Sequence, residues 1–153
     1  MKPPAWRTER AIYPWFCEIQ TRYHDEDLLG HVNNIAQAAY FDEARSRFMR
    51  RLMTTAEPFE RTRIVTADSR VSYLAEVFHP DMIEIGTGIL RIGSASFGLG
   101  QAMFQKGRCV CLCETIFVQA DANGSSPIDP RLRAALEQFM LHAPAREGID
   151  APE

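Results

Sequence analysis

The sequence predicts an α+β fold in which a curved antiparallel β-sheet wraps around one long central helix. An amphipathic, alanine-rich run over residues 35–52 predicts the helix. Four strand candidates follow it, separated by short breaks such as Gly93-Ser94 and Lys106-Gly107. Two-residue breaks between alternating runs are typical of β-hairpins. A meander of antiparallel strands needs one face covered, and the long helix is the obvious cover.

The first half of the chain carries a strand, a turn and the long helix. Apolar and polar residues alternate over residues 15–22, which predicts the first strand, and a tight turn over residues 25–30 follows. Asn33 or Asn34 can cap the helix, because a side-chain oxygen there accepts from N–H groups one turn ahead. The apolar positions of the helix, expected to pack on the sheet, are Ile35, Ala38, Ala39, Phe41, Ala44, Phe48 and Leu52.

The second half of the chain completes the sheet. A loop over residues 54–62, which contains Pro58, is expected to turn the chain back. The four strand candidates then cover residues 63–78, 82–92, 95–105 and 108–119. A short helix over residues 130–141 starts with proline in its first turn. We therefore expect a single domain over residues 15–141, with a polar N-terminal arm (1–14) and a polar C-terminal tail (142–153).

The composition fits one globular domain and argues against several classes of partner. The chain has 153 residues, of which 46% are hydrophobic and 24% charged, so it can bury a proper core. A net charge of −3 gives no general reason to expect nucleic acid or an anionic membrane as a partner. No apolar run approaches the roughly 20 residues that cross a bilayer, and residues 1–10 lack the apolar segment of a secretory signal. A cytoplasmic location is expected.

The cysteines are expected to be reduced core residues. Cys109, Cys111 and Cys113 alternate along one apolar run, so in a strand they would share a face. Neighbours there lie roughly 6–7 Å apart, which suits neither a disulfide nor a compact metal site. Cys17 stands alone in the first strand. Small apolar packing is the simplest role for all four.

The densest group of ionisable and amide side chains lies in residues 23–34, between the first strand and the long helix. A helix start presents free backbone N–H groups and the positive end of the helix dipole. A carboxylate beside it can attack a carbonyl that these groups polarise, or activate water toward it. Three consecutive acids, Asp25, Glu26 and Asp27, crowd this stretch, and like-charge repulsion is expected to raise one pKa among them.

Both the order of elements and this motif resemble the hotdog fold, and more closely the 4-hydroxybenzoyl-CoA thioesterase-like acyl-CoA thioesterases. The signature there is an aromatic residue, an aspartate, a short turn, His-Val-Asn-Asn and a helix with an acidic-Ala-Arg pattern. The matching residues here are Tyr23, Asp27, Leu28-Leu29-Gly30, His31-Val32-Asn33-Asn34 and Tyr40-Phe41-Asp42-Glu43-Ala44-Arg45. Later segments that also match are Phe78-His79-Pro80-Asp81 and Ile92-Gly93-Ser94-Ala95-Ser96. The resemblance covers residues 16–139.

The resemblance implies that Asp27, four residues before His31, is catalytic, either as nucleophile or as general base. It also implies that a backbone N–H near Asn34 polarises the thioester carbonyl. The residues expected to bind substrate are Tyr23, Gly30, His31, Asn33, Asn34 through its backbone N–H, and Tyr73. For His31, structural support of the turn is at least as good a role as catalysis, and Asn33 is expected to be a turn or cap residue that fixes the loop. No cofactor and no metal is implied.

The residues themselves leave other roles open. Asp27 can also be a turn residue that binds its own backbone. Asp42 lies about where a second branch of the fold carries its catalytic carboxylate, but pairing with Arg45 or Arg47 is the expected role. A metal site is conceivable from His24, Asp25, Asp27 and His31. It is not expected, because no other residue supplies a ligand in the right pattern.

The leading hypothesis is hydrolysis of an acyl-CoA thioester to a free acid and CoA. Relatives build the site across a dimer, so a homodimer or a tetramer of two dimers is implied. One alternative is a thioesterase for acyl groups on acyl-carrier protein, which would dock on the helix arginines. Another is a non-catalytic acyl-CoA-binding protein. A dehydratase of the same fold is not expected, because the order of Asp27 and His31 does not match.

The substrate pocket is expected between the helix and the facing strands. Ile35, Ala38 and Phe41 are expected to limit its depth. The phosphates of CoA need cationic or N–H donors. Candidate cations near loop ends are Arg61, Arg63, Arg91, Lys106 and Arg108, and the sequence assigns none of them.

Overall fold

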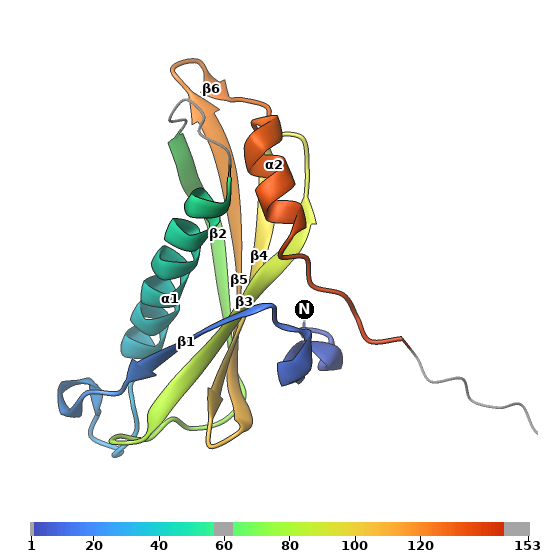
Figure 1. The fold of residues 1–153 in the computed structure, drawn as a ribbon. Coiled ribbons are helices and arrows are strands. Elements are labelled where there is room, and N and C mark those ends of the chain that lie inside the picture. Colours follow the sequence, from blue (N-terminus) through green and yellow to red (C-terminus); the bar gives the residue numbers. More distant parts are fainter. Residues whose placement is uncertain (1, 57–62, 146–153) are drawn as a thin grey trace, which may run out of the picture.

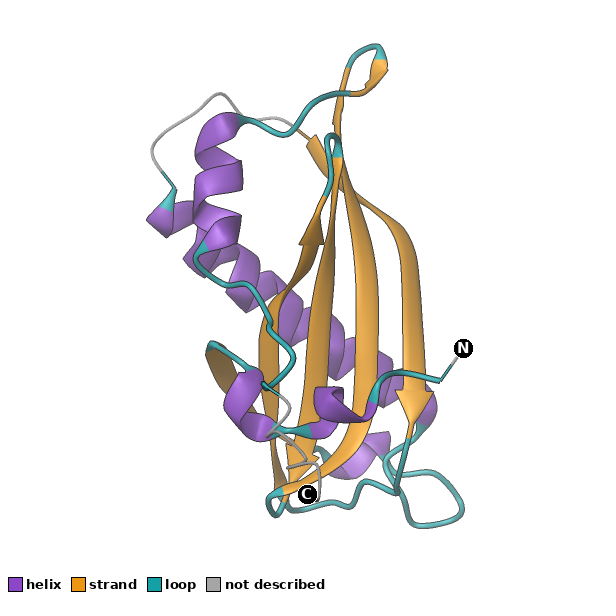
Figure 2. Ribbon diagram, turned by 90° about the vertical axis from the view of Figure 1, so that its right-hand side faces the viewer, coloured by secondary structure: helices purple, strands orange, loops and turns teal. Residues whose placement is uncertain are grey.

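The computed structural model describes residues 2–56 and 63–145, and within these ranges it confirms the predicted sheet around a helix (Figure 1). The six-stranded antiparallel sheet has the order β1-β3-β4-β5-β2, with β6 paired to β5. The strands are β1 Trp15–Gln20, β2 Arg63–Tyr73, β3 Met82–Ile92, β4 Ser96–Gln105, β5 Arg108–Asp121 and β6 Gly124–Ser125. The helices are α1 Asn34–Thr55 and α2 Pro130–Glu137, with 3₁₀ turns at Ala5–Thr8 (η1), Arg10–Ile12 (η2) and Tyr23–Asp25 (η3). Figure 2 shows α1 passing diagonally behind the strands.

Helix α1 begins where the sequence places a cap, and it buries a different face from the one expected. The Asn33 side chain accepts a hydrogen bond from the Ala36 N–H at 2.8 Å, so Asn33 is the N-cap. The buried face consists of Ala36, Gln37, Tyr40, Phe41, Ala44, Phe48 and Leu52. Ile35 is 84% exposed, and Ala38 and Ala39 are exposed too. The expectation for these three residues was wrong, because they lie on the face of α1 that points away from the sheet, opposite the face of Tyr40, Phe41 and Ala44.

The hairpins form where the turn residues predict them, but the first long strand is shorter than expected. Lys106 and Gly107 both have positive φ, 51° and 77°, as the two-residue turns that suit a twisted hairpin require. Strand β2 ends at Tyr73 instead of Phe78. The N–H groups of Leu74 and Ala75 both donate to the Val110 carbonyl, so the ladder ends there. The chain beyond β2 is therefore free to shape a cleft.

The N-terminal segment packs on the sheet, on the face opposite α1. Arg7 is only 1% exposed, and its Nη1 donates to Glu114 Oε1 at 2.7 Å. Its Nε donates to the Tyr13 hydroxyl at 3.2 Å, and Tyr13 packs edge-on against Phe104. Part of the expected N-terminal arm thus packs on the sheet through Arg7 and Tyr13. A charged residue can be buried in this way only because a carboxylate and a hydroxyl meet it there.

The cysteines behave as the small core residues that the sequence indicates. Cys111 and Cys113 are buried in the cluster under α1, and no disulfide joins the four. Burial raises the pKa of the Cys111 thiol to about 12 and that of Cys17 to about 11. These thiols are therefore held in their neutral, apolar form.

The C-terminal helix is shorter than expected and the chain continues as an extended segment. Helix α2 ends at Glu137, before the predicted end at residue 141. The Ile89 N–H donates to the Phe139 carbonyl, and the Leu141 N–H donates to the Ile89 carbonyl, both at 2.7 Å. Residues 146–153 of the predicted tail, and residues 57–62 of the predicted loop, lie outside the described residues. Among the helices within the described ranges, none is long and apolar enough to cross a membrane.

Candidate active site

The turn between β1 and α1 is closed by its own backbone. The Asp27 N–H donates to the His31 carbonyl at 2.9 Å, and the Gly30 N–H donates to the Asp27 carbonyl at 3.1 Å. Gly30 has a φ of +76°, a left-handed conformation that glycine adopts without strain. The chain thus doubles back within four residues, and Asn33 arrives at the start of α1.

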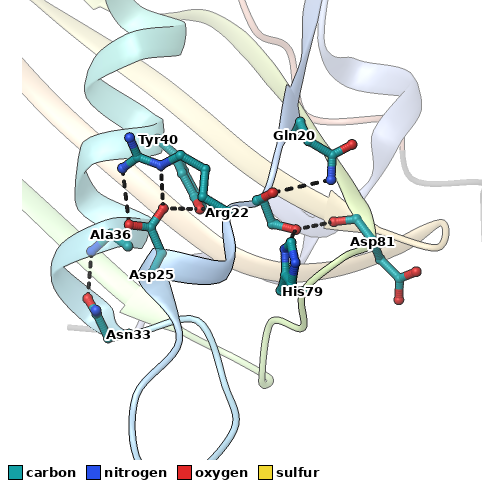
Figure 3. A network of polar contacts seen from close by, with 9 residues as sticks. Gln20, Arg22, Asp25, Asn33, Ala36, Tyr40, His79 and Asp81 are labelled. Carbon is teal, nitrogen blue, oxygen red and sulfur yellow. Dashed lines mark hydrogen bonds and ion pairs between the residues drawn. The ribbon is translucent and has the colours of Figure 1, made fainter.

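Asp25 fastens this turn to the helix (Figure 3). Its carboxylate accepts from Arg22 Nε at 2.8 Å, from Arg22 Nη2 at 3.0 Å and from the Tyr40 hydroxyl at 2.5 Å. Its backbone carbonyl accepts from the Asn33 N–H at 2.8 Å. Hydrogen bonding from Arg22 holds the pKa of Asp25 below its usual value. The pKa of Asp25 is therefore lowered although burial of its carboxyl group acts to raise it, so Asp25 is not the acid whose pKa the crowding was expected to raise.

Asp27 lies outside this network, on the exposed side of the turn. Its Oδ1 accepts from the Leu29 N–H at 2.9 Å and from the His31 N–H at 3.4 Å. This is the backbone-binding turn geometry that the sequence left open. Within the described ranges Oδ2 has no hydrogen-bond partner. One oxygen therefore fixes the carboxyl group and the second is available for a substrate or a water molecule.

The first N–H groups of α1 are the second component of the site. The Asn33 side chain satisfies the Ala36 N–H, and the Gln37 N–H donates to the Asn33 carbonyl at 3.1 Å. The N–H groups of Asn34 and Ile35 have no partner among residues 2–56 and 63–145, as is normal in a first helical turn. The Tyr73 hydroxyl donates to the Asn34 carbonyl at 3.4 Å, which brings the end of β2 beside the helix start.

Carboxylate and helix start border one cleft of about 950 Å³. It is lined by Asp27, Leu29, His31, Val32, Asn33, Asn34, Ile35, Gln37, Tyr73, Leu74, Ala75, Glu76 and Arg108. The structure therefore brings together five of the predicted site residues. Tyr23 and Gly30 are not among the lining residues: the Tyr23 ring packs edge-on against His79, and Gly30 shapes the turn.

Comparison with known proteins places the chain in a family. The family model of the thioesterase-like superfamily matches residues 21–136. The chain belongs to the thioesterase-like superfamily. It is 28% identical over 94 residues to the uncharacterized protein YsmA of Bacillus subtilis, a match that spans 61% of each chain.

Solved structures show the same hotdog fold. The PA5185 protein of Pseudomonas aeruginosa is 29% identical, with a TM-score of 0.76 over 88% of this chain and 97% of that one. A thioesterase from Thermus thermophilus, solved in complex with coenzyme A and Zn, is 21% identical, with a TM-score of 0.72 over 83% and 94% of the two chains. The hotdog fold and the thioesterase family expected from the Asp27–Asn34 motif are thus confirmed.

Other polar residues of this thioesterase-like chain have structural partners. His31 is half-buried, with Nε2 3.5 Å from Glu76 Oε2 and its ring edge-on to Phe78. Asp42 forms an ion pair with Arg45 at 2.6 Å, as expected, so its carboxylate is engaged on the helix surface. Glu43 pairs in the same way with Arg47. Within the described part of the chain, no cluster of three or more His, Cys, Asp or Glu side chains converges.

Sequence reasoning missed several lining residues, among them Leu74, Glu76 and Gln37. Glu76 and Leu74 were assigned to a strand that in fact ends at Tyr73. Gln37 gave no signal, because a glutamine in an amphipathic helix is usually exposed, whereas here it is buried and its Nε2 donates to the Val32 carbonyl at 3.0 Å. Phe41, expected to limit pocket depth, is fully buried in the core instead.

Proposed function

We propose that this protein hydrolyses an acyl-CoA thioester to a free acid and CoA, with Asp27 as the catalytic carboxylate. The observation that carries the proposal is that Asp27 lines the same cleft as Asn34 and Ile35, whose N–H groups have no partner among the described residues. Membership of the thioesterase-like superfamily supports thioester hydrolysis in general. The choice of acyl-CoA as substrate and of Asp27 as catalytic residue goes beyond family membership and is the proposal made here.

Two reaction routes use this geometry. As a general base, Asp27 takes a proton from water while the water oxygen attacks the thioester carbon. The Asn34 N–H stabilises the negative oxygen of the tetrahedral intermediate, the C–S bond breaks, and the CoA thiolate takes the proton from Asp27. As a nucleophile, Asp27 attacks the carbon directly, releases CoA and forms an anhydride that water then cleaves. Both routes consume one water and yield an acid and a thiol.

The cleft also has a group suited to CoA. Arg108 is exposed, lines the cleft and forms no ion pair with any described residue. Of the cations considered from the sequence, Arg108 is a lining residue, whereas Lys106 pairs with Asp81 at 3.1 Å. We assign Arg108 to the phosphates of CoA. A structural neighbour crystallised with coenzyme A supports this choice of substrate.

The remaining substrate-binding assignments follow the cleft. His31, Asn33 and Tyr73 line it, and Asn34 contributes its backbone N–H. Tyr23 is 78% exposed beside the turn, where an acyl or pantetheine group could reach it. The cleft is open on one side, so we propose a homodimer, or a tetramer of dimers, that closes it.

The carrier-protein alternative has less support. Two of the helix arginines, Arg45 and Arg47, are engaged by Asp42 and Glu43. Of that group, Arg50 and Arg51 are exposed and form no ion pair with any described residue. A pair of cations at the end of a helix is a small docking surface for an acidic protein.

The test is a panel of acyl-CoA substrates assayed for free thiol, with wild type and Asp27→Asn side by side. We expect kcat to fall at least about 100-fold in Asp27→Asn, the scale of losing a main acid–base group. Glu26→Gln, the same change one residue earlier, is the matched control and should retain activity. Full activity of Asp27→Asn would overturn the assignment. Tight acyl-CoA binding by the wild type without thiol release would favour the non-catalytic alternative.

A further inference from the structure

One side chain in the wall of the cleft is buried with a polar atom unpaired. Gln37 lines the cleft and is only 4% exposed. Its Nε2 donates to the Val32 carbonyl at 3.0 Å, whereas its Oε1 has no hydrogen-bond partner among the described residues. Burying an acceptor without a donor is unfavourable, and most buried polar atoms have a partner. A donor from a bound molecule is therefore the natural partner of this oxygen.

The bond to Val32 fixes the orientation of the Gln37 amide. A backbone carbonyl only accepts hydrogen bonds, so the amide nitrogen must face it and the oxygen must face away. Side chains in a helix lean toward the N-terminal end, and a bond to a residue five positions earlier fits that direction. Residues three apart lie on the same side of a helix, so Gln37 shares its side with Asn34. The unpaired oxygen is thus held at the start of α1.

A second buried glutamine shows that an unpaired oxygen alone does not make a site. Gln101 on β4 is fully buried, and its Nε2 donates to the Phe41 carbonyl at 3.2 Å. Its Oε1 also has no partner within the described ranges. Gln101 is not a lining residue of the cleft, however, whereas Gln37 lies in the same wall as Asp27. The position beside the proposed catalytic carboxylate is what distinguishes Gln37.

A water molecule that attacks a thioester needs two acceptors. It directs a lone pair at the carbon and has two O–H groups to place. Asp27, whose Oδ1 is bound by the turn, accepts one of them through Oδ2. Elsewhere in the cleft wall, Asn33 Oδ1 already caps α1, and Glu76 Oε2 lies 3.5 Å from His31 Nε2. Gln37 Oε1 is a buried acceptor in this wall that is still unpaired, so it suits the second O–H.

We infer that Gln37 positions the attacking water through Oε1 and that Asp27 acts as a general base, which selects one route of the proposed function and rests on it. The water oxygen bonds to the thioester carbon while one proton passes to Asp27. The second hydrogen stays on the oxygen, directed at Gln37, and leaves with the product as its acid O–H. The Asn34 N–H stabilises the oxyanion, the C–S bond breaks, and the CoA thiolate takes the proton from Asp27.

The first test replaces Gln37 by methionine, which keeps the length of the side chain and removes the acceptor. The kcat for acyl-CoA hydrolysis should fall at least about tenfold, the scale of one hydrogen bond. KM should stay unchanged, because Oε1 contacts the water and not the substrate. Gln101→Met is the matched control, since it makes the same change outside the cleft, and should keep the wild-type kcat. Circular dichroism and urea unfolding verify that both variants are folded.

Methanol separates the positioning of water from support of the turn. Methanol gives its one O–H to Asp27, and its methyl group takes the place of the second hydrogen, so it gains nothing from Gln37. In a water–methanol mixture, Gln37→Met should therefore lose hydrolysis and keep methanolysis. The ratio of methyl ester to free acid should rise about tenfold over that of the wild type. A loosened turn would instead lower both products together and leave their ratio unchanged.

The outcomes separate this inference from the proposed function. With an active wild type, an unchanged kcat or product ratio in Gln37→Met, or an equal loss in Gln101→Met, would overturn the role of Gln37 alone. A single turnover in H₂¹⁸O checks the route: a labelled acid is expected, whereas an unlabelled acid with the label in Asp27 would assign the nucleophilic route and overturn the inference. A wild type that releases no thiol from any acyl-CoA would overturn the proposed function and this inference with it.

Discussion

Replacing Tyr40 by phenylalanine measures how firmly the site turn is held to α1. The Tyr40 hydroxyl donates to the buried Asp25 carboxylate at 2.5 Å and accepts from the Arg22 N–H at 3.3 Å. Phenylalanine keeps the ring and removes both bonds. A hydrogen bond to a charged group contributes about 1.5–3 kcal/mol. We therefore expect Tyr40→Phe to lower the free energy of unfolding by about 2 kcal/mol, or the Tm by about 4–8 °C for a chain of this size.

The size of this loss should depend on pH in a direction that Asp25 sets. Hydrogen bonds from Arg22 lower the pKa of Asp25 in the folded state. A carboxyl group with a lowered pKa stabilises the fold above its unfolded pKa, and this contribution is lost as the pH falls through the folded value. The penalty of Tyr40→Phe should thus be complete at pH 7 and shrink in the acid range, below about pH 4.

Urea unfolding of four proteins at one chain concentration provides the measurement: wild type, Tyr40→Phe, Asp25→Asn and the double variant. The double-mutant cycle should give a coupling of at least about 1 kcal/mol between the two residues. Tyr73→Phe is the control, because its hydroxyl is exposed and makes one long bond of 3.4 Å, so its effect should stay within about 0.5 kcal/mol. Additive single changes, or equal effects of the two tyrosine variants, would refute the reasoning.

Two further predictions concern the cleft. Arg108→Ala should raise KM for acyl-CoA about tenfold, the scale of one charge-assisted bond, and leave KM for the matching acyl-pantetheine thioester unchanged. Steady-state kinetics on both substrates measures this, with Arg91→Ala as the control. Equal changes in KM on the two substrates would contradict the assignment of Arg108 to the phosphates. Asn33→Ala should lower the free energy of unfolding by about 1 kcal/mol through loss of the α1 cap. Asn33→Asp can still accept a hydrogen bond from the Ala36 N–H, so its urea unfolding midpoint should be close to that of the wild type. Equal stability of the two variants would contradict the capping role.

The sequence predicts this fold well because its signals are local. The hairpin at Lys106-Gly107 needs positive φ at two residues, and the cap at Asn33 needs one side-chain oxygen. The spacing of Asp27 to the His-Val-Asn-Asn motif is also local, so it identifies the acid that lines the cleft among the three candidates. In each case the residues that decide the structure are neighbours in the chain.

What the sequence does not predict depends on distant partners. Arg7 looks like part of a polar arm, and its burial depends on Glu114, more than a hundred residues away. The end of β2 depends on Val110, whose carbonyl takes two successive N–H groups. Glu76 enters the cleft as a result, and a strand assignment that runs on to Phe78 hides it. The placement of these residues depends on tertiary contacts, which a periodic pattern in the sequence does not predict.

The ion pair between Arg7 and Glu114 connects the beginning of the chain to the last two strands of the sheet, β5 and β2. Glu114 is the direct cross-strand neighbour of Arg70, and Arg7 already occupies its carboxylate at 2.7 Å. A chain shortened past Arg7 would leave Glu114 in need of a cation, and Arg70 is placed to supply one. Removal of the N-terminal segment would thus rearrange the charges on β2 without altering a single residue of that strand.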